Sequence, residues 1–410
     1  MIEAAILIGG ILLVVATVAS RLADTLGMPT LLLFLVVGML AGSEGLGGIR
    51  FDSPEDAQEI GTAALMVILF AGGLDTRWKA VRPVLAPGLM LSTVGVLLTA
   101  LLVAAFSKWL LGTFTDFNVG ISVGLTWLEA LLIAAIISST DAAAVFSVYS
   151  TSPVQPHPKL RHLLELESGS NDPMAVLLTV TILGIMVEGQ VVELSLALTV
   201  VLQFLMGAAI GGAVGWAGGT LCNRLRFSTG YLYPMLVLGF GACAFGLASL
   251  AGGNSFLAVY VAGLVIGNVI RLGRDEVISF HNGLSWLMQI AMFVMLGLLV
   301  FPSQLMPVAW ASLAVAAFLI FVARPIAVLV CYMPFSPDWR EASYVSWVGL
   351  RGSVPIVLAT FPATWGVANA DKLFHFVFFI VITSVLVQGM TLVSAARLLG
   401  VTETDLRAGR

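Results

Sequence analysis

Long apolar stretches recur along this chain from residue 4 to residue 397, and only short polar loops separate them. Little polar surface remains, because 59% of the 410 residues are hydrophobic and 10% are charged. A soluble globule of this length could not be covered by so few polar side chains. The stretches are continuously apolar, whereas the strands of a membrane β-barrel alternate. The sequence therefore predicts an all-α, polytopic membrane protein.

The apolar stretches divide into thirteen candidate transmembrane helices. Because this number is odd, the two termini are expected on opposite sides of the membrane. The predicted spans lie at roughly residues 3–20, 28–43, 57–74, 86–110, 120–150, 161–187, 192–222, 231–250, 254–270, 282–301, 307–332, 342–361 and 373–396.

The distribution of basic residues supports this count, because cytoplasmic loops of membrane proteins are enriched in Lys and Arg. Most of the 19 basic residues fall in alternate loops and in the C-terminal tail. Only Arg50, Lys108 and Lys372 fall in the opposite set of loops. The N-terminus is therefore expected outside the cell and the C-terminus in the cytoplasm.

A polar cluster interrupts the sixth predicted span. Two carboxylates, two hydroxyls and an amide lie between Glu167 and Asp172, directly before the apolar run 174–187. If the cluster were a loop, residues 173–187 would be too short to cross, and the alternation of basic loops would be lost. As one helix, residues 161–187 extend about 40 Å, which places Asp172 near the bilayer centre. The alternative is a solvent-exposed helix cap, but ionisable residues at membrane depth are functional candidates.

Spans five and twelve are each broken by residues that weaken a helix. The fifth contains Ser138-Ser139-Thr140-Asp141, whose hydroxyls can bond freed backbone groups. The twelfth contains Gly349, Gly352 and Pro355. Because the two spans are seven apart, they run in opposite directions through the membrane. Interrupted helices at corresponding places in two halves are typical of inverted-repeat secondary transporters.

The expected organisation is one membrane transporter domain, residues 1–397, and a short cytoplasmic tail, residues 398–410. Repeat one spans about residues 3–187, a linker helix about 192–222, and repeat two about 231–397. The linker helix carries a stripe of small residues that allows close helix approach, either within one protomer or between protomers. The stripe consists of Gly207, Gly211, Gly215 and Gly219.

Three further charged residues are predicted at membrane depth. Asp141 would compensate the positive N-terminal ends of the half-helices, and Arg351 the negative C-terminal ends. Arg324 can pair with Glu167, although either arginine could instead extend to the membrane surface. Glu167 and Asp172 lie about 140° apart around a helix. One carboxylate can therefore form a structural ion pair while the other faces a water-filled path.

Three motifs give the chain a family resemblance that covers nearly its whole length. They are Ser139-Thr140-Asp141-Ala-Ala-Ala-Val-Phe146, Glu167-Ser-Gly-Ser-Asn171-Asp172-Pro-Met-Ala-Val176 and Trp347-Val-Gly-Leu-Arg351-Gly-Ser-Val-Pro355, and Ala323-Arg324-Pro325 also fits. With these motifs the chain resembles the monovalent cation:proton antiporter-1 family, and most closely its bacterial NhaP branch. The resemblance implies the NhaA/NapA-like antiporter fold: thirteen helices, two inverted six-helix repeats and crossed, unwound helices five and twelve. It also implies a homodimer in the bacterial inner membrane.

The resemblance also implies roles for individual residues. Asp172 would alternately bind a proton or an alkali cation, in a site lined by Asn171, Thr140 and Ser168, with Asp141 beside it. The cation itself would contact Asp172, Thr140 and Ser168. Glu167 would pair with Arg324 as first choice or with Arg351 as second. The Asn-Asp pair is associated in the family with electroneutral one-for-one exchange.

The function expected from these features is exchange of an alkali cation, potassium before sodium, for protons, without a cofactor. Burial disfavours the charged form of Asp172 and a bound cation restores it, so proton and cation would exclude each other. No nucleotide-binding loop, metal-ligand cluster or nucleophile triad is visible, so neither an ATP-driven pump nor an enzyme is expected, nor a nucleic-acid partner. A passive cation channel and a transporter of another solute are the alternatives. Family members commonly continue into cytoplasmic regulatory domains, so the short tail suggests truncation or a naturally short member.

Overall fold

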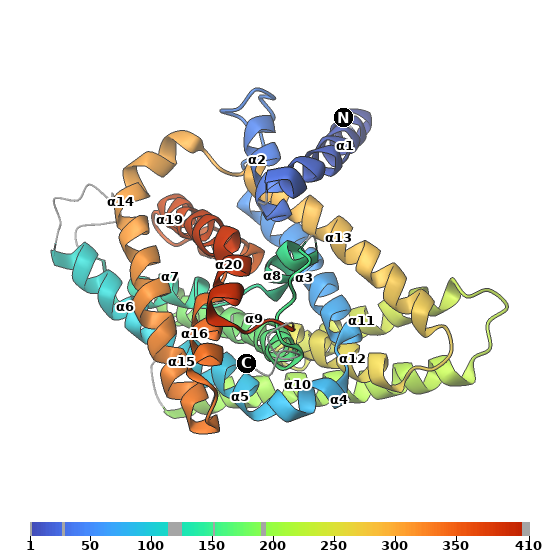
Figure 1. Cartoon of the computed structure of the whole chain (residues 1–410). Coiled ribbons are helices and arrows are strands. Elements are labelled where there is room, and N and C mark those ends of the chain that lie inside the picture. The colour runs from blue at the N-terminus through green and yellow to red at the C-terminus, as the bar shows by residue number, and fades with distance from the viewer. Residues whose placement is uncertain (1, 27–28, 114–124, 151, 190–193, 404–410) are drawn as a thin grey trace.

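The computed structural model describes residues 2–26, 29–113, 125–150, 152–189 and 194–403. These residues form helices joined by short connections, and their β structure consists of two isolated bridges (Figure 1). The first half contains α1 (Ile2–Leu26), α2 (Thr30–Ala41), α3 (Pro54–Asp75), α4 (Trp78–Val81), α5 (Leu85–Met90), α6 (Val96–Thr113), α7 (Trp127–Ile136), α8 (Ala142–Ser150), α9 (Pro158–Val187) and α10 (Leu194–Arg224). The second half contains α11 (Leu232–Leu250), α12 (Ser255–Val269), α13 (Arg274–Leu298), α14 (Pro302–Phe318), α15 (Arg324–Tyr332), α16 (Trp339–Trp347), α17 (Ser353–Leu358), α18 (Phe361–Thr364), α19 (Ala370–Ser384) and α20 (Met390–Leu399).

Several of these helices join end to end into longer ones through short π-helical or 3₁₀ segments. The π-helical segments are Leu91–Gly95, Leu319–Ala323 and Val385–Gly389, and the 3₁₀ segments are Arg82–Val84 and Met333–Phe335. In the described residues, eight helices are long and apolar enough to cross a membrane, and five further apolar helices are shorter. The predicted all-α membrane fold is therefore confirmed. The count of thirteen spans stays a prediction, because length and composition alone do not define the membrane boundaries.

The fifth and twelfth predicted spans are each broken in the middle, as the sequence indicated. Residues 137–141 separate α7 from α8, and residues 348–352 separate α16 from α17. The two breaks meet, because the backbone N–H of Asp141 donates to the carbonyl of Leu350 at 2.8 Å. Gly352 is required here, since a Cβ at this position would overlap the Asp141 carboxylate.

The polar cluster of the sixth span lies inside a continuous helix. α9 runs over 30 residues with Pro173 in its interior. Asn171 and Asp172 are both buried near the middle of α9, so the solvent-exposed helix cap is excluded. The helix begins with Pro158 in its first turn, where the missing N–H of proline costs nothing.

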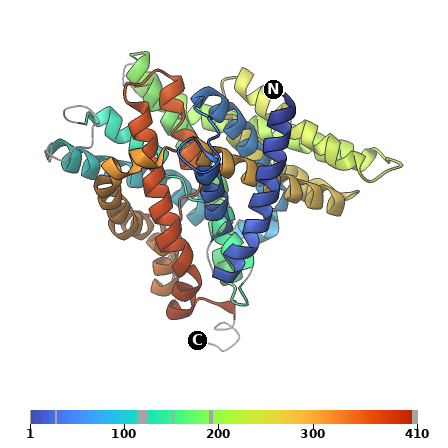
Figure 2. The same cartoon turned by 90° about the horizontal axis from the view of Figure 1, so that it is seen from above.

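The helices pack in two groups. A scaffold group consists of α1–α3 and α10–α13, in which α10 packs along α12, α12 along α3, and α13 along α2 and α3. A core group consists of α4–α9 and α14–α20, in which α14 packs on α19, α6 on α7, and α7 on α9. Figures 1 and 2 show α6 and α14 of the core group on the opposite side of the molecule from α11 of the scaffold group. The groups meet where α9 and α17 contact α3 and where α9 contacts α12.

The glycine stripe of α10 packs within the protomer. A Cβ at Gly207, Gly211 or Gly215 would meet backbone atoms of the α12 chain, and one at Gly219 would meet Val269. Since glycine has no side chain, the axes of α10 and α12 can approach closely along this stripe. Packing inside the chain thus accounts for the stripe without a partner subunit.

The residues after α20 contact the connection between α8 and α9. Pro156 and Thr402 form an antiparallel bridge, and the N–H of His157 donates to Val401 at 3.0 Å. Residues 404–410, including Arg407 and Arg410 of the predicted cytoplasmic tail, lie outside the described residues. The same holds for the first residues of the predicted spans 28–43, 120–150 and 192–222.

Candidate functional site

Asp172 lies at the centre of the polar region. The residue is only 6% exposed, and the hydroxyl of Ser139 donates a hydrogen bond to its Oδ1 atom. Ser139 belongs to the unwound segment between α7 and α8, so the break in one helix supplies a partner for the carboxylate in the next. The sequence motif contained Ser139, but reasoning from the sequence did not place it in the site. The run of three hydroxyl residues before Asp141 was the available signal.

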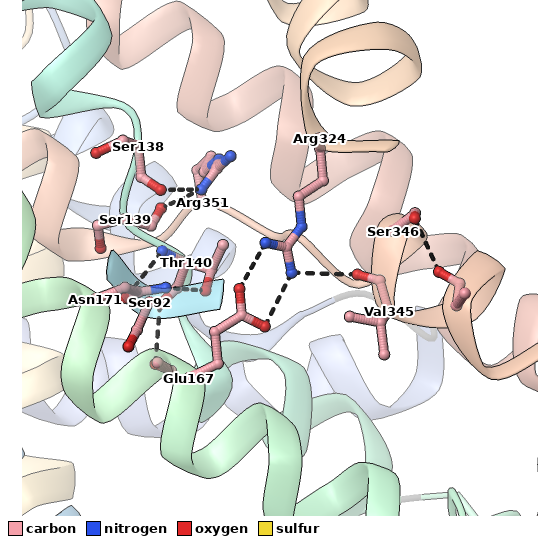
Figure 3. Close-up of polar contacts among 12 residues, drawn as sticks. Ser92, Ser138, Ser139, Thr140, Glu167, Asn171, Arg324, Val345, Ser346 and Arg351 are labelled. Atoms are coloured by element: carbon pink, nitrogen blue, oxygen red, sulfur yellow. Dashed lines mark hydrogen bonds and ion pairs between the residues drawn. The ribbon is translucent and has the colours of Figure 1, made fainter. Parts of the chain in front are cut away.

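Ser168 and Asn171 bond the unwound backbone beside Asp172. The Ser168 hydroxyl donates to the carbonyl of Thr140 at 2.9 Å and accepts from the N–H of Ala142 at 3.0 Å. The Asn171 amide group donates to the Thr140 hydroxyl at 2.6 Å, and its Oδ1 accepts from the backbone N–H of Thr140 at 3.4 Å (Figure 3). The predicted residues Thr140, Ser168 and Asn171 are therefore brought together around Asp172. In this structure the two α9 side chains satisfy the backbone that the break leaves unpaired.

Charged side chains face the ends of the half-helices at the crossing. The Asp141 carboxylate accepts from the N–H of Ala144 at 2.9 Å, and it lies against Gly352, the residue before α17, so it faces the N-terminal ends of both α8 and α17. The Arg351 guanidinium donates to the carbonyls of Ser138 and Ser139 at 2.6 and 2.7 Å (Figure 3). A carboxylate thus lies at helix N-termini and a cation at a C-terminus, as the helix dipoles favour.

Glu167 and Arg324 form an ion pair inside the core group. Two nitrogens of Arg324 lie 2.5 and 3.0 Å from the two oxygens of Glu167, and one also donates to the carbonyl of Val345 at 3.2 Å (Figure 3). Glu167 is 1% exposed and Arg324 is 4% exposed. Of the two pairings expected from the sequence, this is the first choice. Arg351 is also buried, so neither arginine extends to the protein surface.

Two residues of the last span support the second break and were not foreseen. The N–H of Arg351 donates to the Ser384 hydroxyl at 3.0 Å, and the Gln388 amide donates to the carbonyl of Trp347 at 2.7 Å. Ser384 also donates to Gln388 at 2.5 Å. These bonds satisfy backbone groups at the break in span twelve, as Ser168 and Asn171 do at the break in span five.

A cavity of about 390 Å³ leads to the site between the two helix groups. The core group contributes Asp141, Ser168, Gly169 and Asp172 to its wall, and the scaffold group contributes Thr76, Tyr260, Ser285 and Gln289. Near the start of α9 the wall also contains Glu165, which forms an ion pair with Arg161 at 2.9 Å. The cavity therefore connects the buried carboxylate with the end of the protein where α9 begins.

The transmembrane sodium/hydrogen exchanger family matches residues 10–397 of this chain. The chain belongs to this family. Among its relatives, the K(+)/H(+) antiporter NhaP of Alkalimonas amylolytica is 42% identical over 400 residues, which are 97% of this chain and 67% of that protein. The K(+)/H(+) antiporter NhaP2 of Shewanella sp. (strain MR-4) is 40% identical over 96% of this chain and 66% of its own length. The chain thus spans about two thirds of these relatives.

Solved structures support the same fold. The sodium proton antiporter MjNhaP1 from Methanocaldococcus jannaschii, determined at pH 8, aligns with a TM-score of 0.81. The alignment covers 97% of this chain and 99% of that one at 24% identity. A second MjNhaP1 structure, an electron-microscopy map, aligns with a TM-score of 0.78. The exchanger-family chain therefore has the predicted antiporter fold.

Proposed function

We propose that this chain is a secondary transporter that exchanges a monovalent cation for protons. The observation that carries the proposal is Asp172, a buried carboxylate midway along α9 that lies in the wall of a cavity. An ionisable group in that position is costly to bury and marks an ion or proton pathway. Membership of the exchanger family supports this function, and no enzymatic step is required for it.

The proposed mechanism is competition at Asp172. A carboxylate in a dry site is disfavoured in its charged form, and either a proton or a bound cation neutralises it. Hard cations take oxygen ligands, which the Asp172 carboxylate and the hydroxyls of Ser139, Thr140 and Ser168 can supply. If only the neutralised site crosses the membrane, each cation moved in one direction is exchanged for a proton in the other. Asn171 is uncharged, so one carboxylate carries the exchange, and we propose a one-for-one, electroneutral stoichiometry.

Potassium is the favoured cation, with sodium as the alternative. Two relatives at 40–42% identity are named K(+)/H(+) antiporters, whereas the family as a whole carries the name of sodium/hydrogen exchangers. Transport in the presence of potassium, sodium, lithium or rubidium separates the two possibilities. The preferred substrate is the cation with the lowest half-saturating concentration at a fixed pH.

Alternating access would come from displacement of the core group against the scaffold group. The cavity opens at the end where α9 begins, near Arg161, which the basic-residue pattern assigns to the cytoplasm. We therefore propose an inward-facing conformation, with the N-terminus outside and the C-terminus inside a bacterial inner membrane. We also propose a homodimer and two inverted repeats within residues 1–397.

Cation-dependent proton flux in inverted membrane vesicles tests this function. We expect Asp172→Asn to abolish the response of a pH-sensitive dye to added potassium or sodium, because the variant cannot exchange a proton for a cation. The control is Asp275→Asn, which neutralises an exposed carboxylate in the first turn of α13. Full flux from Asp172→Asn contradicts the assignment. A voltage-driven cation current without proton movement would instead favour a channel.

A further inference from the structure

Pro173 lies inside α9, directly after Asp172, although the helix continues on both sides of it. In an α-helix the carbonyl of each residue accepts a hydrogen bond from the N–H four residues later. Proline has no N–H, so the carbonyl of Gly169 lacks its usual helical donor. Helix carbonyls point toward the C-terminal end, so the Gly169 oxygen faces the turn that carries Asp172.

Gly169 lies in the wall of the cavity, beside the scaffold group. Gly169 and Asp172 both line the cavity wall. Because they are three residues apart, they are neighbours on the surface of α9. The ring of Tyr260 from the scaffold group occupies the space that a Cβ of Gly169 would need. A buried carbonyl without a donor costs about 1–3 kcal/mol, so an ion or a water molecule in the cavity is its natural partner.

Four other backbone carbonyls near Asp172 already accept hydrogen bonds from side chains. The Thr140 carbonyl accepts from Ser168 at 2.9 Å, and the Ser138 and Ser139 carbonyls accept from Arg351. The carbonyl of Pro173 itself accepts from the Asn254 amide, at 2.8 Å, at the start of α12. The Gly169 oxygen differs from these four carbonyls, because Pro173 has no N–H to donate to it.

We propose that the backbone carbonyl of Gly169, freed by Pro173, is a ligand of the transported alkali cation beside Asp172. The inference rests on the proposed function and adds a ligand to its site. A carbonyl oxygen binds an alkali cation but takes up no proton at physiological pH. This ligand therefore favours the cation over the proton in their competition for Asp172, and its loss weakens cation binding specifically.

Pro173→Ala tests the proposal, because alanine supplies the missing N–H and occupies the Gly169 carbonyl. We expect the half-saturating potassium or sodium concentration to rise about tenfold or more at fixed pH, which corresponds to the loss of one good ligand. The maximal exchange rate should change less. The matched control is Pro307→Ala, which adds one N–H inside α14, away from the cavity. It should leave the half-saturating concentration unchanged.

Wild-type protein and Asp172→Asn in the same vesicles separate the possible failures. Wild-type vesicles without exchange contradict the proposed function, whereas normal exchange with an unchanged half-saturating concentration in Pro173→Ala overturns the carbonyl ligand alone. If Pro173→Ala does not fold, Pro173→Gly supplies the same N–H. A structure of the unaltered protein with Rb⁺ gives an independent answer. An ion bound at Asp172 without contact to the Gly169 oxygen overturns the proposal.

Discussion

The buried pair Glu167–Arg324 leads to a prediction about stability. Glu167→Gln keeps the shape of the side chain but leaves the Arg324 charge without its partner. Breaking a buried ion pair from one side typically lowers the free energy of unfolding by about 3–5 kcal/mol. We therefore expect a lower melting temperature and poorer expression, measured on detergent-solubilised protein.

A double variant distinguishes a structural role of this pair from a role in transport. Glu167→Gln combined with Arg324→Met removes both charges, and replacing a buried pair by uncharged groups is often close to neutral. Stability should therefore recover relative to the single variant. A Glu167→Gln protein that melts like the wild type but does not exchange cations would assign Glu167 to transport.

Glu44 carries a pH-dependent contact outside the predicted spans. Its carboxylate accepts from the hydroxyl of Ser303 at 2.5 Å and from the N–H of the same residue at 2.8 Å. These bonds hold the pKa of Glu44 below its ordinary value of 4.5. A lowered pKa contributes stability that is complete above that value and is lost as the pH falls below it.

We expect the wild-type protein to have a higher melting temperature than Glu44→Gln at neutral pH. That advantage should shrink as the pH falls below 4.5 and the carboxylate becomes protonated. Glu59→Gln, which removes the same charge near the start of α3, is the control. A difference that does not change between pH 7 and the acidic range would show that the Glu44 carboxylate does not stabilise the start of α14.

The site residues that cost the most free energy to bury were the easiest to predict from the sequence. Asp172 and Glu167 could be identified because a carboxylate in an apolar segment needs a reason to be there. Ser139 could not be assigned, because a serine is tolerated at many places in a membrane helix. Ser384 and Gln388 gave no signal for the same reason, since their role depends on which backbone groups lie opposite them. Only the three-dimensional crossing determines that.

The elements were predicted well where the sequence breaks a helix, since residues 138–141, Gly349 and Gly352 fall at the observed breaks, whereas Pro355 lies in the first turn of α17. Glycine, proline and hydroxyl residues weaken a helix locally, so their effect is visible without tertiary information. The helix that packs on the glycine stripe of α10 was not predictable from the sequence. A face of small residues can pack against a helix of the same chain or against a second protomer.

Neighbouring glycines of α10 give a matched test of this packing. Gly211→Ala puts a methyl group against the backbone of Ala258, whereas Gly212 has open space around its Cβ position. We expect Gly211→Ala to lower the free energy of unfolding by about 1–3 kcal/mol, because α10 and α12 must separate. Gly212→Ala should be neutral or slightly stabilising. Equal melting temperatures for the two variants would contradict the close packing of these helices.

At the scale of the whole molecule, the division into two groups determines where the cavity beside Asp172 lies. Sequence patterns predicted helices and their order, but not that α9 would lie between a core group and α12. That arrangement depends on which helix faces pack together. All of these faces are apolar, so the sequence does not show which helix each one contacts. The cavity wall illustrates this, because Tyr260 and Gln289 come from helices that carried no candidate residue.

The contact between Tyr260 and Gly169 is where the two groups meet beside the ion site. A methyl group at residue 169 would overlap the Tyr260 ring, so Gly169→Ala should obstruct any displacement of α9 along α12. We expect strongly reduced exchange with the half-saturating cation concentration little changed. Gly169→Ala combined with Tyr260→Leu removes the overlap and should restore part of the rate. If the double variant is as slow as Gly169→Ala alone, the obstruction does not lie between these two residues, and the core group moves along another surface.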